Sequence, residues 1–205
     1  MIKKFFGALI AIIFLIAPIT YAAALPTVAV LPFHKKAAVS AELTLEDEDY
    51  AAELVNEHLT NSGRFDVVDR EYLSEALREQ AFGLSGAVDP NTAAQMGKIV
   101  GAKYIVVGSI NGLSLVNKVG KVVGVGGKSF KVVAHISARM VEVETGRVIL
   151  ASSGKGESTA HRIEAPLRLI RIGTEDISQE QVYDAIDKAT AELSKKMLSN
   201  MDNRG

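Results

Sequence analysis

The chain has 205 residues, of which 23 are basic and 24 acidic, so its formal net charge at pH 7 is −1. A near-neutral chain offers no electrostatic attraction to nucleic acid, and we expect no nucleic-acid partner. The sequence contains no cysteine. This excludes disulfides, thiolate metal sites, a cysteine nucleophile and the acylated cysteine of a bacterial lipoprotein.

The N-terminus has the three parts of a secretory signal peptide. Lys3 and Lys4 precede an apolar run at 5–19, and small residues follow. A membrane anchor is the alternative, but it needs about 20 apolar residues. Pro18 and the small residues favour cleavage, after Ala22 or after Ala24. The expected organisation is a cleavable signal peptide at 1–24, one α/β domain at 25–200 and a frayed tail at 201–205.

The first half of the mature chain predicts the order β-α-β-α-α-β. Short apolar runs indicate strands, and capping residues and glycines mark the ends of helices. The expected elements are a strand at 27–33, a helix at 45–62, a strand at 65–68, a helix after Asp69, a helix opened by Asp89 and Pro90 and ended by Gly101, and a strand at 104–107. These helices should bury Ala51, Leu54, Val55, His58 and Leu59, then Tyr72, Leu73, Ala76 and Leu77, then Ala93, Met96 and Val100.

The second half predicts a hairpin and a last helix. Residues 130–140 alternate between apolar and polar, which is typical of a half-exposed strand. A turn at 144–147 leads to a short returning strand at 148–150. Ser178 and Gln181 form a capping box before a helix, whose inward stripe is Val182, Ile186, Ala189, Leu193 and Met197. The fold class is therefore α/β, a mixed sheet flanked by helices.

No stretch of the chain predicts catalysis, a cofactor or a metal. Residues 120–129 are rich in glycine but lack the spacing of a phosphate loop and lead into a strand, so a hairpin or loop is expected. His34, His58, His135 and His161 are far apart. We expect His58 to be half-buried and His135 to lie on an exposed strand face. The acids at 46–49 fit a helix start, with a cation site as the alternative. We assign no site residue and expect no enzyme.

Several linked segments resemble one family. They are Val28–Phe33, Ser62–Glu71, Leu77–Gln80, Gly86, Val88–Asp89, Met96–Ser109 and Val143–Arg147. Together they resemble the curli production assembly/transport component (CsgG) family. The resemblance implies a periplasmic domain of the anticodon-binding-like type. In the curli channel such domains form a ring, and each subunit donates two hairpins to a shared outer-membrane β-barrel that passes unfolded fibre subunits. Other members resemble periplasmic accessory proteins without a barrel, including activators of peptidoglycan synthases.

Two stretches have the length of the family's hairpins. The first, 109–133, should turn near 117–121, and the second, 152–177, is interrupted by Pro166. Ordinary periplasmic hairpins are the alternative for both. Two features of the channel do not carry over: the lipidated cysteine is missing, and Lys35–Glu46 holds neither the aromatic residues nor the asparagine of the channel's constriction.

The expected function is therefore an outer-membrane secretion or assembly component. It would form a ring in the periplasm and donate β-hairpins to a shared pore. The alternative is a soluble periplasmic accessory protein that regulates envelope or cell-wall assembly. The resemblance implies a homo-oligomer, envelope or secreted protein partners and outer-membrane contact, without a lipid anchor.

Overall fold

The computed structural model describes residues 24–36, 45–79, 89–122, 125–164, 171–172 and 179–203. Its elements in chain order are β1 (Thr27–Val30), β2 (His34–Lys35), α2 (Leu45–Asn61), β3 (Asp66–Val67), α3 (Arg70–Glu79), α4 (Pro90–Ile99), β4 (Tyr104–Val122), β5 (Val125–Glu142), β6 (Val148–Glu164), β7 (Arg171–Ile172) and α5 (Gln179–Asp202). Residues 1–23 of the predicted signal peptide and the cap at Ser178 lie outside the described residues.

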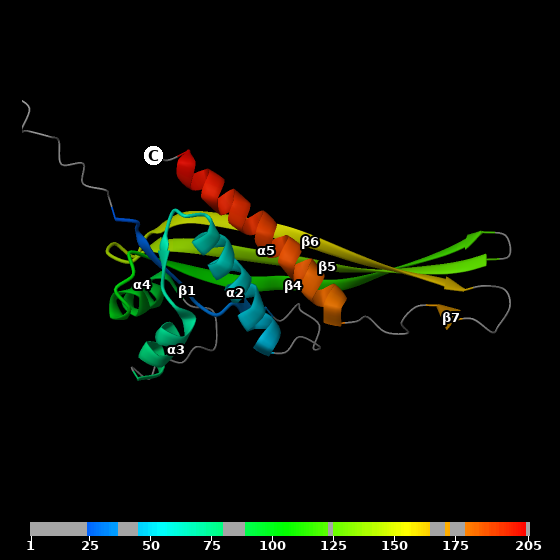
Figure 1. Cartoon of the computed structure of the whole chain (residues 1–205), viewed down its shortest axis with the longest axis horizontal. Helices are drawn as coiled ribbons and strands as arrows, with labels where there is room; N and C mark the ends of the chain where they lie inside the picture. The colour runs from blue at the N-terminus through cyan, green and yellow to red at the C-terminus, as the bar shows by residue number, and fades with distance from the viewer. Residues whose placement is uncertain are drawn as a thin grey trace, which may run out of the picture.

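The strands form one mixed sheet of seven strands (Figure 1). Its order is β3-β1-β4-β5-β6-β7, with β2 beside β4. β1 is parallel to both of its neighbours, β3 and β4, and β2 is parallel to β4. The pairs β4–β5, β5–β6 and β6–β7 are antiparallel. The predicted fold class and the predicted order β-α-β-α-α-β are confirmed, with the short β2 added.

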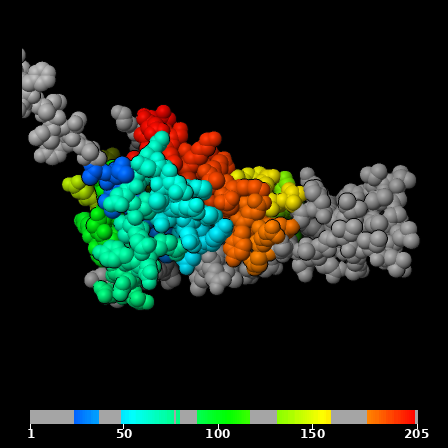
Figure 2. All heavy atoms as spheres, in the orientation of Figure 1, coloured from blue at the N-terminus to red at the C-terminus, as the bar shows by residue number. Residues whose placement is uncertain are grey.

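Helices cover both faces of the sheet because its central strands are apolar on both sides. Val28 and Val30 of β1 point into a core under α2 and α5, whereas Ala29 and Leu31 belong to a second core under α3 and α4. Figures 1 and 2 show α2 and α5 side by side over one face. Such two-sided burial is typical of parallel strands.

The helices begin and end where the sequence predicts. Asp89 precedes α4 and its carboxylate accepts hydrogen bonds from the amides of Asn91 and Thr92, at 2.9 and 3.2 Å. Gly63 and Gly101 follow α2 and α4 with φ of 65° and 68°. This left-handed conformation costs a glycine little, which is why glycine is common after a helix.

The predicted inward stripes are largely confirmed. All the predicted residues of α2 except His58 are buried. Also buried are the predicted residues at α4 and four of the stripe in α5: Ala93, Met96, Val100, Ile186, Ala189, Leu193 and Met197. Tyr72 is an error in the prediction, because it is 55% exposed. Helix α3 packs on the sheet through Leu73 and Ala76, and Tyr72 lies beside this stripe rather than on it. The Leu77 side chain lies outside the described residues.

Three strands are much longer than predicted. β4, β5 and β6 contain 19, 18 and 17 residues, where the residue pattern suggested strands at 104–107, 130–140 and 148–150. The described part of the expected hairpin stretch 109–133 lies in the paired strands β4 and β5, and that of 152–177 lies in the pair β6 and β7. Helix α5 likewise continues to Asp202, beyond the predicted start of the frayed tail. Arg64 holds its last turn, donating to the Asp202 carboxylate and to the Leu198 carbonyl at 2.5 and 3.0 Å. Within the described residues, no helix combines the length and apolarity needed to span a bilayer.

Candidate functional site

The three long strands extend beyond the helices as a β ribbon (Figure 1). We define this ribbon as residues 112–122 of β4, 125–135 of β5 and 155–164 of β6. Its base, with Val132, Ala134 and Gly156, still packs under α5, and its outer part extends beyond the helices (Figure 1). The β4–β5 pairing is continuous from Gly112 and His135 to Val122 and Val125. The hairpin therefore turns between Val122 and Val125, and the predicted turn at 117–121 is wrong. The glycine-rich stretch 120–129 forms the two strand ends beside this turn, as its context predicted.

A β-bulge marks the point where the ribbon leaves the body. Ile110 pairs with Ile136 and Gly112 with His135, so Asn111 has no partner in the register. The Asn111 amide donates to the Ser137 hydroxyl at 2.8 Å, and Ser109 lies 3.0 Å from the Asn111 side-chain oxygen and 3.1 Å from Ser137. These bonds hold the side chain of the extra residue against the sheet face opposite α5.

The same face carries a charged row on the ribbon. Glu157 of β6 pairs with Lys131 of β5 at 2.5 Å and with Lys155 at 2.7 Å. Hydrogen bonds from Lys131 and then Lys155 lower the pKa of Glu157 to about 2. The carboxylate is therefore charged at any ordinary pH and links neighbouring strands.

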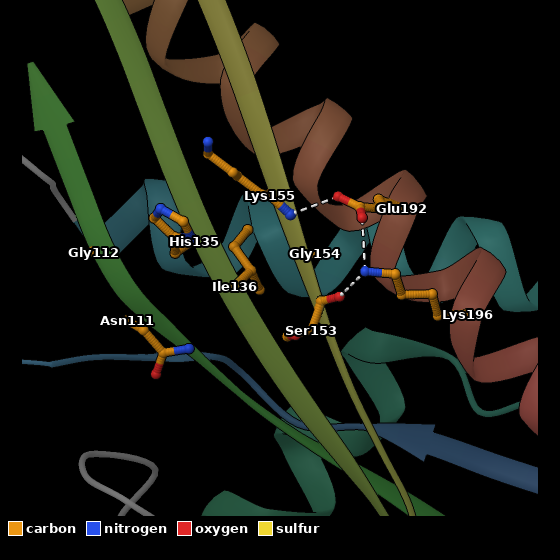
Figure 3. Close-up of a pocket in the computed structure, with 9 residues that line it drawn as sticks. All are labelled: Asn111, Gly112, His135, Ile136, Ser153, Gly154, Lys155, Glu192 and Lys196. Carbon is orange, nitrogen blue, oxygen red and sulfur yellow. Dashed lines mark hydrogen bonds and ion pairs between the residues drawn. The ribbon is translucent and has the colours of Figure 1, made fainter. Parts of the chain in front are cut away.

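Side chains of α5 bond to the outer edge of β6 (Figure 3). The Lys155 amide donates to the Glu192 carboxylate at 2.8 Å. The Lys196 and Lys188 ammonium groups donate to the carbonyls of Ser153 and Glu157 at 3.1 and 3.2 Å. Because an amide donates once, the Lys155 backbone faces away from β5, and so do the alternate residues 153 and 157. We call this set of bonds the α5 guard.

A cavity of about 410 Å³ lies beside the α5 guard. Figure 3 shows the residues that line it: Asn111, Gly112, His135, Ile136, Ser153, Gly154, Lys155, Glu192 and Lys196. Glu192 already binds the Lys155 amide and Lys196, and these contacts, Lys196 first, lower the pKa of its carboxyl. The arrangement offers hydrogen-bonding groups, but it pairs no nucleophile with a base. Among the described residues, no three histidine or acidic side chains are grouped to hold a metal ion.

A second cavity of about 400 Å³ lies between the starts of α2 and α5. Tyr50 and Tyr183 meet there edge to face with ring centroids 4.8 Å apart. Burial, followed by the negative charge of Asp187, Glu53 and Glu57, raises the pKa of Tyr50. Asp49, from the predicted acidic helix start, bonds Arg70 at 2.6 Å, so it has a structural partner. The other side chains of 46–49 lie outside the described residues.

The three histidines with described side chains, His34, His58 and His135, lie on three different elements, β2, α2 and β5. His58 is half-buried, as predicted, and its Nε2 is buried without a hydrogen-bond partner among the described residues. His135 lies exposed on the strand face predicted for it, and His34 is on β2. The His161 side chain lies outside the described residues. The α5 guard was not predicted from the sequence, because its bonds join residues 31 to 43 positions apart.

Comparison with known proteins identifies the family. The model of the curli production assembly/transport component CsgG family matches residues 17–205. No curated protein sequence matches the chain.

Several solved structures are similar to this chain at low sequence identity. A protein described as a neuraminyllactose-binding hemagglutinin homologue from Helicobacter pylori has 13% identity and a TM-score of 0.51, over 88% of this chain and 91% of that one. The hypothetical protein CT253 from Chlamydia trachomatis has 14% identity and a TM-score of 0.49, over 88% and 97%. The LpoB C-terminal domain from Salmonella enterica has 18% identity and a TM-score of 0.46, over 65% and 85%. The likeness to the Helicobacter protein concerns the fold alone, and with a family match that spans nearly the whole sequence, the chain belongs to the CsgG family.

Proposed function

We propose that this protein is an exported envelope component for secretion or assembly, in which the α/β body forms a ring and the β ribbon is donated to a shared pore. Family membership supports the class of function. The β ribbon carries the specific proposal, because it extends beyond the helices that complete the core. Leu115 and Val116, on opposite ribbon faces, are 44% and 39% exposed. Exposed apolar side chains on both faces of a projecting ribbon indicate that another molecule covers this surface.

The test is fractionation of the exported protein, followed by sizing in mild detergent. The proposal expects recovery from outer membranes as a high-mass oligomer. The matched control is a shortened-ribbon variant, in which an Asn-Gly turn replaces 117–130 and joins Val116 to Lys131, which pair in β4 and β5. This variant should lose membrane extraction but keep its fold. A wild-type protein that stays monomeric in detergent at every concentration would refute the ring.

A second candidate is a soluble periplasmic accessory protein that regulates envelope or cell-wall assembly. The charges of the β ribbon favour it. A membrane-spanning strand needs about 9–11 residues with one apolar row. In β4, alternate positions from Leu113 give Leu115, Asn117, Val119 and Lys121, and the other row holds Lys118. Neither row is continuously apolar.

Affinity capture from a periplasmic extract separates the two candidates. An accessory protein should remain in the soluble fraction and bring down one defined envelope partner in stoichiometric amount. The shortened-ribbon variant tests whether the β ribbon makes that contact. Recovery of the wild type only as a membrane-embedded ring counts against this candidate.

We also propose that the protein acts by binding rather than by catalysis, without a cofactor and without a lipid anchor. Among the described residues, Asn111, Glu192 and Lys196 at the first cavity bond to other protein groups, and no hydrogen bond joins His135 to an acid. Turnover of hydrolase or nucleotide substrates by the purified protein, lost on substitution of His135 or Glu192, would show the opposite.

A further inference from the structure

We propose that the edge of β4 at 112–116 binds the same edge of a second copy, which makes a two-fold dimer through continuous β-sheet. This edge is defined by Gly112, Leu113, Ser114, Leu115 and Val116. It contains no charge and no proline, the two devices that usually protect an exposed strand edge. The proposal goes beyond the ring described above and does not depend on it.

The edge of β4 is open among the described residues. β2 pairs with β4 only at Ser109 and Ile110, and Lys36 adds one amide bond to the Ile110 carbonyl at 3.1 Å. From Gly112 onward the described residues supply a partner for β4 only on the β5 side. A strand edge in this state presents unpaired amides and carbonyls next to two exposed apolar side chains, which is a template for strand addition.

The opposite edge of the β ribbon is protected. The α5 guard bonds three outward backbone groups of β6, the carbonyls of Ser153 and Glu157 and the amide of Lys155, and β7 pairs with Ile163 and Glu164. Lysine and glutamate side chains at a strand edge are a common barrier to pairing with another chain. Residues 153–157 of β6 are therefore blocked from pairing with the β4 of a second copy, whereas β4 can pair with itself.

The edge is complementary to itself in one register. In an antiparallel pair with Ser114 opposite Ser114 of the second copy, Leu113 lies opposite Leu115, and Gly112 lies opposite Val116. Leu113 and Leu115 occupy the row of Ala134 and Val132, on the α5 side of the sheet. The pairing thus extends an apolar row across the two-fold axis and brings no like charges together.

A dimer of this kind is closed, because both chains contribute the same edge and a third chain finds no free copy of it. It occupies the strand edge that a shared pore would need. The dimer keeps the β4 edges from uncontrolled pairing with other chains.

The absence of cysteine makes a clean crosslinking test possible. Ser114→Cys places one thiol near the proposed axis. Ser153→Cys is the matched control, since both serines are exposed and lie on the same sheet face, but Ser153 is on the edge held by the α5 guard. After mild oxidation of the detergent-free protein, Ser114→Cys should run mostly as a disulfide-linked dimer and Ser153→Cys as a monomer. Equal crosslinking of the two variants would overturn the proposal.

Sedimentation of the cysteine-free protein gives a second readout that does not depend on disulfide geometry. The wild type should sediment with twice the mass of one chain, and Leu115→Lys should shift it to the mass of one chain. Leu115 is 44% exposed, so the fold tolerates lysine there, and circular dichroism checks this. A monomeric wild type, or a dimer unchanged by Leu115→Lys, contradicts the β4 pairing. A ring observed in detergent supports the proposed function, whereas the detergent-free measurements decide the β4 dimer.

Discussion

Gly154 and Gly156 of β6 lie directly under helix α5. A Cβ atom added at Gly154 would overlap the carbonyl oxygen of Ala189, and one at Gly156 the carbonyl oxygen of Ala185. Ala185 and Ala189 are themselves fully buried small residues. The two glycines and two alanines thus let the backbone of the helix approach the backbone of the strand.

Gly156→Ala should therefore destabilise the protein by about 1–3 kcal/mol, the usual cost of overpacking. The clash is with backbone, which cannot rotate away. Urea unfolding followed by circular dichroism measures the change. Gly112→Ala is the control, because a Cβ at this β4 glycine meets nothing within 4 Å, and its stability should stay near that of the wild type. Equal stability of the two variants would contradict the close packing of α5.

Glu157 gives the molecule a pH-dependent contact. Its pKa is lowered to about 2 by Lys131 and Lys155, from 4.5. A carboxyl whose pKa is lower in the folded than in the unfolded protein stabilises the fold at any pH above its unfolded pKa. This contribution is lost as the pH falls from about 4.5 towards 2. Since the group is partly exposed, the effect is small.

Glu157→Gln should lower the melting temperature at pH 7 by no more than about 2–4 °C. The difference from wild type should shrink steadily below pH 4.5 and vanish near pH 2. Thermal melts across this range provide the measurement. Glu144→Gln, at an exposed turn position, should show little difference at any pH. A gap between Glu157→Gln and wild type that persists at pH 2 argues against the ion pairs.

At the scale of elements, α4 depends on its first turn. The Asp89 carboxylate accepts from two amides and from the Thr92 hydroxyl, at 2.5 Å for the hydroxyl, and these bonds, led by the Thr92 side chain, lower its pKa. Asp89→Ala should lower the melting temperature by about 2–4 °C, whereas Asp89→Asn should keep most of the stability. Calorimetry at neutral pH compares them. An alanine variant as stable as the asparagine variant would show that the cap contributes nothing.

The contact between α5 and the edge of β6 can be tested at one amide. Glu192→Ala removes the acceptor of the Lys155 amide, so hydrogen exchange at this amide should accelerate by at least about tenfold, if the bond contributes about 1.4 kcal/mol or more against local opening. Exchange at Val133, inside the sheet, should not change. Lys195→Ala is the control on the exposed side of α5. An unchanged rate at Lys155 would mean that the amide is protected in another way.

Sequence patterns predicted the amphipathic elements, which have one apolar face and one polar face. The alternation at 130–140 predicts the strand, and Val132, Ala134, Ile136, Ala138 and Met140 are buried on one face. The residue pattern ended β6 at residue 150, because Gly154, Lys155 and Gly156 lower its strand propensity, and only the family resemblance indicated a hairpin at 152–177. Pairing with β5 along nearly its whole length overrides that propensity. The Glu192–Lys155 bond joins residues 37 positions apart and leaves no local signal.

At the scale of the whole molecule, the body and the β ribbon differ in what holds them. Among the described residues, the buried cluster under α2 and α5 reaches Val132 and Ala134 at the base of the β ribbon, and the cluster under α3 and α4 reaches β5 only at Val141. The shortened-ribbon variant, without 117–130, should therefore melt within about 2–4 °C of the wild type, since it removes no buried core residue described here. Circular dichroism gives the melting temperature. Loss of cooperative melting in this variant would show that the β ribbon belongs to the folding unit.

The bulge at Asn111 sets the phase of the β ribbon. In an uninterrupted strand, residues 110 and 113 would face opposite sides, yet Ile110 and Leu113 both pack in the core under α5. The inserted residue thus reverses which side of the sheet each later residue of β4, from 112 to 122, faces, and it brings Leu113 and Leu115 to the α5 side. Deleting Asn111 would keep β4 as a strand but exchange its two faces, with the leucines on the charged row of Lys131 and Glu157. A length change of one residue here alters the surface of the β ribbon more than any single substitution within it.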